Sequence, residues 1–330
     1  MDWPASAIGA AFRLPTRIRR RAETPVVLGI DVEPDPRTFD PRDPPPWDGL
    51  ESFLERIPSL RRLLATATGA PAAFTWFLRM DPQVATTWGS PGWVADNYGD
   101  ALADLVASGD QLAVHTHAWR WEDATEEWVA DYEDADWMEH CLTVGLDAFE
   151  VAFGRPCEAY RGGDYFLNGA LLSCLDARGV KVDMSVEPGR PPQSPPQGDP
   201  ARGMLPDYRD VPTVPYRSSP ARFPAPDPAD PRGPVLLPIF SPPGRHGTRF
   251  PLSPETTLSR FVPRLAAGLL RESPPVLALT ARSTSSLGSA WDTFESNLVH
   301  LARHDQMRFM TASAAAARFV TPSAELERSG

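Results

Sequence analysis

Short apolar runs alternate along this chain with longer stretches in which apolar residues recur every three or four positions. The first pattern is typical of buried strands and the second of helices that bury one face. The apolar runs predict strands over residues 25–31, 72–78, 111–117, 158–161, 180–185, 235–240, 276–280 and 307–310. The helical pattern predicts a helix that opens at Asp48, helices over residues 93–108, 126–153, 168–178, 255–270 and 291–301, and a final helix after the last strand. Because such alternation is typical of parallel sheets, we expect an α/β protein built on a parallel sheet or barrel.

One segment interrupts the alternation. Residues 188–234 are rich in proline and show little periodicity, which is typical of a long loop. We therefore interpret residues 25–320 as a single domain that carries a proline-rich insertion at 188–234. Residues 1–24 and 321–330 are interpreted as terminal tails.

Two histidines in the predicted strand 111–117 have a spacing that suits metal binding. His115 and His117 are two residues apart, and side chains two apart in a strand point to the same side. Asp31 and Glu33 have the same spacing at the end of an earlier apolar strand. A carboxylate and two imidazoles, with further positions open to water, are a common ligand set for a catalytic divalent metal such as zinc.

A second carboxylate that stays off the metal would act as a base toward water. Asp31 and Glu33 can point into one cavity, one as base and the other as ligand. Arg161 also ends a predicted strand, and chemistry in parallel barrels collects at the carboxyl ends of strands. The structural alternatives are that Asp31 simply ends its strand, that Glu33 is solvated and that Arg161 forms a surface ion pair.

Aromatic and charged residues near these strand ends are candidates for substrate binding. Trp76 and Trp119 would contribute to a wall on which the apolar face of a sugar packs. Arg79 and Asp81 follow the second predicted strand and would line the same cavity. The alternatives are that the tryptophans belong to the core and that Arg79 pairs locally with Asp81.

Charge and composition narrow the classes of partner. The net charge of -11 disfavours nucleic acid and anionic membranes as partners, so we expect a small-molecule or carbohydrate substrate. Three cysteines without a Cys-x-x-Cys pair indicate neither a disulfide framework nor a structural zinc knot. No run is long enough to cross a membrane, and the first residues do not resemble a signal peptide. We therefore expect a cytoplasmic protein, whose oligomeric state the sequence leaves open.

Several segments, taken in order, resemble the motifs of the polysaccharide deacetylase family, carbohydrate esterase family 4. The first three are Asp-Val-Glu at 31–33, Phe-Thr-Trp-Phe-Leu at 74–78, and His-Thr-His-Ala-Trp at 115–119, a variant of the family's metal-binding motif. The next are Tyr-Arg-Gly-Gly-Asp-Tyr at 160–165 and Val-Asp-Met-Ser-Val at 182–186. The resemblance covers nearly the whole chain, and this protein would be a divergent member.

The resemblance implies a distorted (β/α) barrel that hydrolyses N-acetyl groups of amino sugars with a divalent metal, usually zinc. On the matching positions it implies a metal site formed by Glu33, His115 and His117. Asp31 would be the catalytic base and Arg161 would orient it. Tyr165, in the same segment as Arg161, is expected to bind substrate.

The chain departs from the family pattern in three places. Members often place the second metal histidine four residues after the first, where this chain has Trp119, so His117 must serve instead. Asp164 stands where arginine is frequent. Arg282 replaces the histidine that usually acts as general acid; an arginine does not donate a proton usefully, but it can stabilise an oxyanion. His246 is a candidate substitute for the acid.

These inferences together predict a metal-dependent hydrolase of a carbon–nitrogen bond, which removes an N-acetyl group from a sugar or glycan precursor. Two alternatives stay open. The first is an amidohydrolase that acts on a non-sugar amide, which a cleft with few aromatic residues and more arginines would favour. The second is a non-catalytic protein of the same fold that binds a glycan or a partner, which the loss of the acid histidine would suit.

Overall fold

The centre of the protein is an eight-stranded sheet in which the paired strands are parallel. A computed structural model describes residues 23–36, 38–194, 200–230, 232–244, 247–304 and 306–319. The strand order is β10-β1-β2-β3-β6-β7-β9, and β11 pairs with the start of β1. The strands are β1 (Thr24–Val32), β2 (Thr75–Arg79), β3 (Gln111–Thr116), β6 (Ala159–Gly162), β7 (Val182–Asp183), β9 (Val235–Leu236), β10 (Leu277–Arg282) and β11 (Met307–Phe309).

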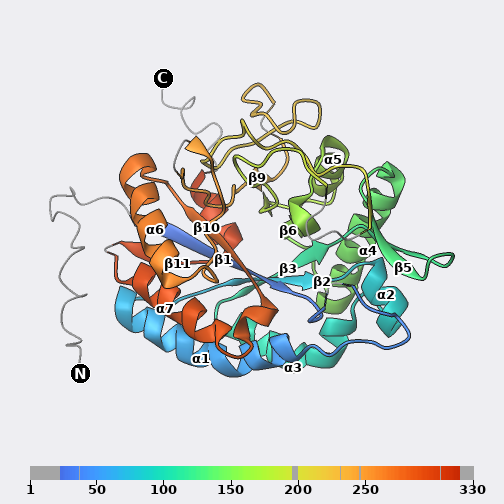
Figure 1. Ribbon diagram of the computed structural model, residues 1–330, viewed down its shortest axis with the longest axis horizontal. Coiled ribbons are helices and arrows are strands. Elements are labelled where there is room, and N and C mark those ends of the chain that lie inside the picture. The colour runs from blue at the N-terminus through green and yellow to red at the C-terminus, as the bar shows by residue number, and fades with distance from the viewer. Residues whose placement is uncertain are drawn as a thin grey trace, which may run out of the picture.

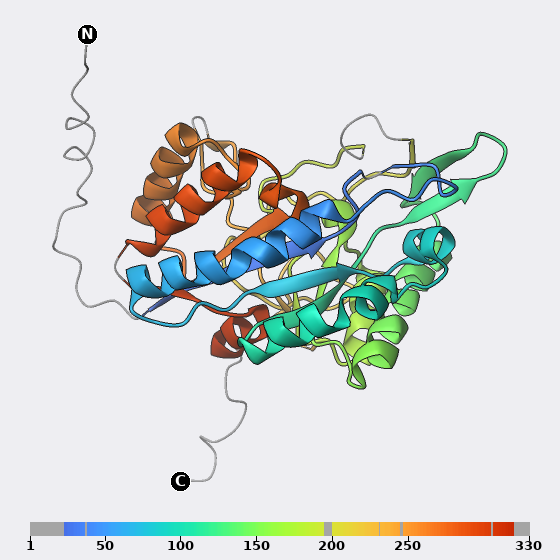
Figure 2. The same cartoon turned by 90° about the horizontal axis from the view of Figure 1, so that it is seen from below.

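Most of the helices lie around the outside of this sheet, as Figure 1 shows. They are α1 (Asp48–Thr68), α2 (Pro82–Trp88), α3 (Trp93–Ala107), α4 (Ala135–Phe153), α5 (Gly169–Ala177), α6 (Leu258–Glu272), α7 (Ala290–Ala302) and α8 (Ala312–Ala316). Helices α1 and α7 lie side by side although they are far apart in the sequence (Figures 1 and 2). The architecture is the distorted (β/α) barrel that the sequence predicted.

The segment after β9 joins the two edges of the sheet. Its backbone N–H groups at Leu237 and Ile239 donate to carbonyls of Asp183 and Val186, each at 2.8 Å. The next N–H group, of Phe240, donates at 2.8 Å to the carbonyl of Ala278 in β10. These bonds satisfy backbone groups that an open sheet edge would expose, and they close the barrel on this side.

The alternation of side chains along the strands separates two cores. Residues such as Val27, Phe77 and Ala278 fill the inside of the barrel, where the alanines of α8 pack against them. Residues one position away face the helices and form the larger core. Because successive side chains in a strand point to opposite faces, the inward set continues through Asp31, Arg161 and Arg282 to the carboxyl ends of the strands.

One predicted helix is wrong over its first third. The apolar spacing predicted a helix over 126–153, but α4 begins at Ala135. Residues Glu127–Asp131 form strand β5, which pairs antiparallel with β4 (Trp119–Glu122). Glu126 has a φ of 54°, which turns the chain between the strands, and the rings of Trp121 and Trp128 pack 5.3 Å apart across them. These cross-strand contacts outweigh a helical pattern that is only local.

The proline-rich insertion packs against the barrel where it is described. Its strand β8 (Ala201–Arg202) adds to β5, and Tyr208 is fully buried. No described helix is long and apolar enough to cross a membrane.

Candidate metal centre and active site

The predicted site residues meet because their strands are neighbours. In the sheet register, Asp31 lies beside Arg282, and His115 lies beside Arg161. Glu33 directly follows β1, and His117 directly follows β3. All of these residues except Arg282 are buried. The carboxyl ends of β1, β3, β6 and β10 therefore bring carboxylates, imidazoles and guanidiniums to one place, as the strand-end argument predicted.

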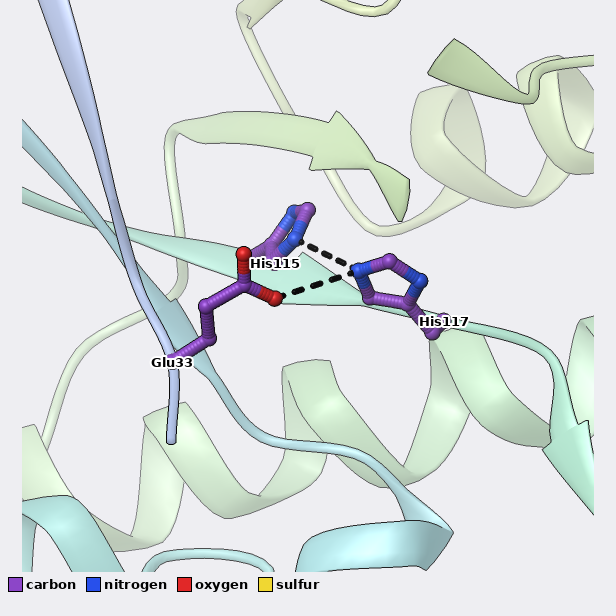
Figure 3. A group of neighbouring side chains, drawn as sticks. All are labelled: Glu33, His115 and His117. Atoms are coloured by element: carbon purple, nitrogen blue, oxygen red, sulfur yellow. Dashed lines mark hydrogen bonds and ion pairs between the residues drawn. The ribbon is translucent and has the colours of Figure 1, made fainter. Parts of the chain in front are cut away.

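Glu33, His115 and His117 point their ligand atoms at one another (Figure 3). The Nε2 atoms of His115 and His117 are 3.1 Å apart, and Nε2 of His117 is 3.5 Å from Oε2 of Glu33. Ligand atoms about 2.0–2.1 Å from a tetrahedral zinc ion lie about 3.3 Å from one another. The three side chains therefore fit a zinc-sized ion.

Hydrogen bonding and burial keep His115 in the form that binds metal. Its Nδ1 lies 2.8 Å from the carbonyl oxygen of Arg161, which can only accept a proton, so Nδ1 carries the hydrogen and Nε2 keeps its lone pair. Burial lowers the pKa of His115 well below its usual value, and the neighbouring His117 lowers it further. A neutral imidazole with a free Nε2 is the form that ligates a divalent cation.

A charged network supports Glu33 and His117 from behind. Arg79 lies 3.3 Å from Glu33 and 2.5 Å from Asp81. Asp81 also accepts the backbone N–H of His117 at 2.9 Å. Burial alone would raise the pKa of Glu33, but the hydrogen bond from His117 and the charge of Arg79 together hold that pKa below its usual range. Glu33 is therefore a carboxylate, as a metal ligand must be.

Asp31 lies beside the metal triad without belonging to it. Arg161 contacts its carboxylate at 3.3 Å, and its Oδ1 is buried without a hydrogen-bond partner among the described residues. Burial raises the pKa of Asp31 to about 7, although Arg161 opposes the shift. A carboxylate whose pKa is near neutrality is suited to accept a proton and to release it again.

A pocket of about 240 Å³ is lined by Asp31, by Arg161 and by the three proposed metal ligands. Tyr165, Thr280 and Arg282 complete the walls from the strand ends, and the loop at 251–255 covers one side with Ser253 and Glu255. Apart from the two histidines, Tyr165 is the one aromatic residue of the described lining. The guanidinium carbons of Arg161 and Arg190 lie 4.9 and 5.1 Å from the centre of its ring. The pocket is therefore polar, and its aromatic ring is already engaged.

Four residues expected to bind substrate lie outside this lining, which corrects the prediction. Trp76 is fully buried against α1, with its ring 5.4 Å from that of Phe53. Trp119 is fully buried behind His117, its ring stacked 6.3 Å away. Arg79 and Asp81 form the supporting network and have no exposed surface. On β2 the inward positions are Thr75, Phe77 and Arg79, so strand alternation itself turns Trp76 outward.

Sequence reasoning missed three other residues near the site. Glu255 was placed in a predicted helix, but α6 begins at Leu258, and Glu255 accepts a hydrogen bond from the backbone of Arg282 at 3.2 Å. Tyr132 was also placed in a helix, yet its hydroxyl donates to Asp164. Arg190 lies in the insertion, where composition gave no signal. His246, the candidate acid, lies outside the described residues.

The backbone behind His117 is tightly constrained. Gly163 lies so close that a Cβ there would overlap the His117 ring. Asp164 and Tyr165 follow with φ of 52° and 63°, a left-handed conformation that costs about 1–2 kcal/mol for each residue other than glycine. This turn places Oδ2 of Asp164 3.7 Å from Nδ1 of His117.

The substitution Gly163→Ala is therefore expected to displace His117 and to weaken zinc binding by at least about tenfold, the lower end for disturbed second-shell contacts. Zinc affinity measured by competition with a chromophoric chelator checks this. Gly99→Ala is the matched control, because nothing lies near a Cβ at that position. Equal zinc affinity in the two variants would show that His117 does not ligate the metal.

No protein-family model and no curated protein match this chain. Solved structures do match it. The PuuE allantoinase has a TM-score of 0.53 at 14% identity, over 97% of this chain and 98% of that one. A probable polysaccharide deacetylase from Pseudomonas aeruginosa PAO1 has 0.52 at 13%, over 90% and 91%. A candidate glycoside hydrolase/deacetylase from Parabacteroides distasonis has 0.54 at 13%, over 90% and 71%. The chain has the polysaccharide deacetylase fold, which the sequence resemblance implied.

Proposed function

We propose that this protein is a divergent member of the polysaccharide deacetylase family and a metal-dependent hydrolase of an amide-type carbon–nitrogen bond. The observation that carries the proposal is the convergence of Glu33, His115 and His117 beside a buried carboxylate, Asp31, in one pocket. Ligands for a cation and a base of suitable pKa are the two elements that such hydrolysis requires.

A divalent cation such as zinc, held by the triad, would supply Lewis acidity toward the substrate carbonyl and toward water. Asp31 accepts one proton of the attacking water, whose oxygen bonds to the carbonyl carbon, and then delivers that proton to the nitrogen as the carbon–nitrogen bond breaks, which leaves a carboxylic acid and an amine. Arg161 holds Asp31 in place by its ion pair. Arg282, which is always cationic, stabilises negative charge that develops at the pocket wall.

The first candidate substrate is an N-acetylated sugar or glycan precursor, because polysaccharide deacetylases share the fold. The second candidate is a small non-sugar amide. The described lining favours it. Apart from the two histidines, its one aromatic residue is Tyr165, which already contacts two guanidiniums, and it also carries Arg161 and Arg282. An allantoinase also has this fold, so the barrel is not tied to sugars.

The zinc-reconstituted protein tests both candidates. Acetate release from N-acetylglucosamine oligomers would support the first, and hydrolysis of N-acetyl amino acids or allantoin, without activity on the oligomers, would support the second. We expect activity that a chelator removes and zinc restores. Stoichiometric zinc without turnover on any of these compounds would instead support a non-catalytic binding protein, and absence of zinc binding would overturn the proposal.

A further inference from the structure

The proline-rich insertion contacts the left-handed turn that stands behind His117. Two of its side chains, Arg190 and Tyr208, are buried and reach successive carbonyl groups of that turn. Nη1 of Arg190 donates to the carbonyl of Asp164 at 2.9 Å, and the Tyr208 hydroxyl donates to the carbonyl of Tyr165 at 3.0 Å. The insertion thus bonds to both residues that have positive φ.

The insertion itself holds these two side chains in register. The N–H of Gly189 donates to the carbonyl of Tyr208, and the N–H of Tyr208 donates to the carbonyl of Arg190, each at 2.8 Å. A third bond of 2.8 Å runs from Leu205 to Gln193. These bonds form a short antiparallel ladder, so Arg190 and Tyr208 approach the turn as one unit.

The insertion contacts the backbone of the turn, whereas the side chains of the turn face the metal site. Oδ2 of Asp164 lies 3.7 Å from Nδ1 of His117 and accepts the hydroxyl of Tyr132. Nδ1 of His117 is buried and has no hydrogen bond among the described residues. A carboxylate that faces the outer nitrogen of a metal-ligating imidazole helps to orient the ring. The ring of Tyr165 meanwhile contacts the guanidiniums of both Arg161 and Arg190.

We propose that the insertion is a positioning element of the metal site, in which Arg190 and Tyr208 hold the Asp164–Tyr165 turn in its left-handed conformation so that Asp164 orients His117. The inference rests on the proposed function, because it concerns the metal that the triad would bind. A left-handed backbone at two consecutive residues other than glycine persists only where surrounding contacts impose it, and these two hydrogen bonds are such contacts.

The test compares Tyr208→Phe with Tyr216→Phe. Each removes one hydroxyl from the insertion, and the Tyr216 hydroxyl donates at 2.9 Å to Pro224, away from the site. We expect zinc to bind about 10–100-fold more weakly to Tyr208→Phe, as for the loss of an outer-shell partner, and with unchanged affinity to Tyr216→Phe. Arg190→Gln should weaken zinc binding in the same direction, and Asp164→Asn should reproduce the loss without changing the insertion. Melting temperatures of the metal-free variants report the structural cost separately.

Equal zinc affinity in the two tyrosine variants, together with weaker zinc binding in Asp164→Asn, would overturn the positioning role of the insertion but not the proposed metal site.

Crystal structures of the metal-free proteins provide a readout that needs no metal. The Asp164–Tyr165 turn should leave the left-handed region in the double variant Arg190→Gln, Tyr208→Phe and stay there in Tyr216→Phe. A turn unchanged in the double variant would also overturn the proposal. If the wild-type protein bound no zinc, the proposed function would fail, while this structural comparison would still decide whether the insertion holds the turn.

Discussion

His115→Ala is expected to abolish zinc binding and hydrolysis together. The substitution removes one of three ligands and leaves Glu33 and His117, whose ligand atoms are 3.5 Å apart, to hold the ion alone. Loss of an outer-shell partner already costs about 10–100-fold in affinity or activity, and loss of a ligand should exceed that. Elemental analysis of the purified protein and product release under the same conditions measure both effects.

Zinc-dependent stabilisation gives an independent measure of the same change. Zinc present at about 100 times its dissociation constant should stabilise the folded wild-type protein by about 2.7 kcal/mol, and should not stabilise His115→Ala. His140→Ala is the matched control, because His140 is exposed on α4 and packs against Trp137. It should keep zinc content, activity and stabilisation. Full zinc content in His115→Ala would contradict the proposed triad.

Asp31→Asn is expected to lower kcat by about 10²–10⁴-fold, the usual contribution of a positioned general base, while zinc stays bound. Asparagine preserves the shape of the side chain but cannot accept the proton of water. The three proposed ligands do not include Asp31, so elemental analysis should find the wild-type zinc content. Loss of zinc together with activity would instead make Asp31 a ligand.

The same residue should set the acid limb of the pH profile. The carboxylate form is the active one, so kcat/KM should rise with pH as Asp31 loses its proton. Burial raises the pKa of Asp31 to about 7 in the metal-free protein, and a neighbouring cation favours the carboxylate and lowers that pKa. The limb is therefore expected at or below pH 7, and it should disappear from the residual activity of Asp31→Asn. Asp43→Asn, an exposed carboxylate away from the pocket, should leave rate and profile unchanged.

Arg282 is the departure that most affects the mechanism. It lies beside Asp31 in the sheet register, where the family resemblance places a histidine that acts as general acid. Because a guanidinium keeps its protons at all relevant pH values, the proposed mechanism gives both proton transfers to Asp31. Glu255, bonded to the backbone of Arg282, adds a carboxylate to this wall that the sequence had not indicated.

The strands of the main sheet and the shared side of the site residues could be predicted from the sequence because both follow from local periodicity, and the resemblance to polysaccharide deacetylases implied the barrel. Apolar runs identified every strand of the main sheet, and β-strand alternation placed His115 beside His117 and Asp31 beside Glu33 on inward positions. The same alternation turns Trp76 toward α1, so grouping the tryptophans by residue type alone overlooked information that the strand pattern contains.

Only the tertiary structure decided the surroundings of that centre. The stretch 127–131 fits a helical pattern, yet it became β5 because its partner strand β4 supplies cross-strand contacts. Glu255 was placed in a predicted helix, yet it reaches the pocket from the loop before α6, and Arg190 reaches the layer behind the pocket from the insertion. Side chains that meet across tens or hundreds of residues leave no mark on their local sequence, because their positions depend on how the strands and loops pack together.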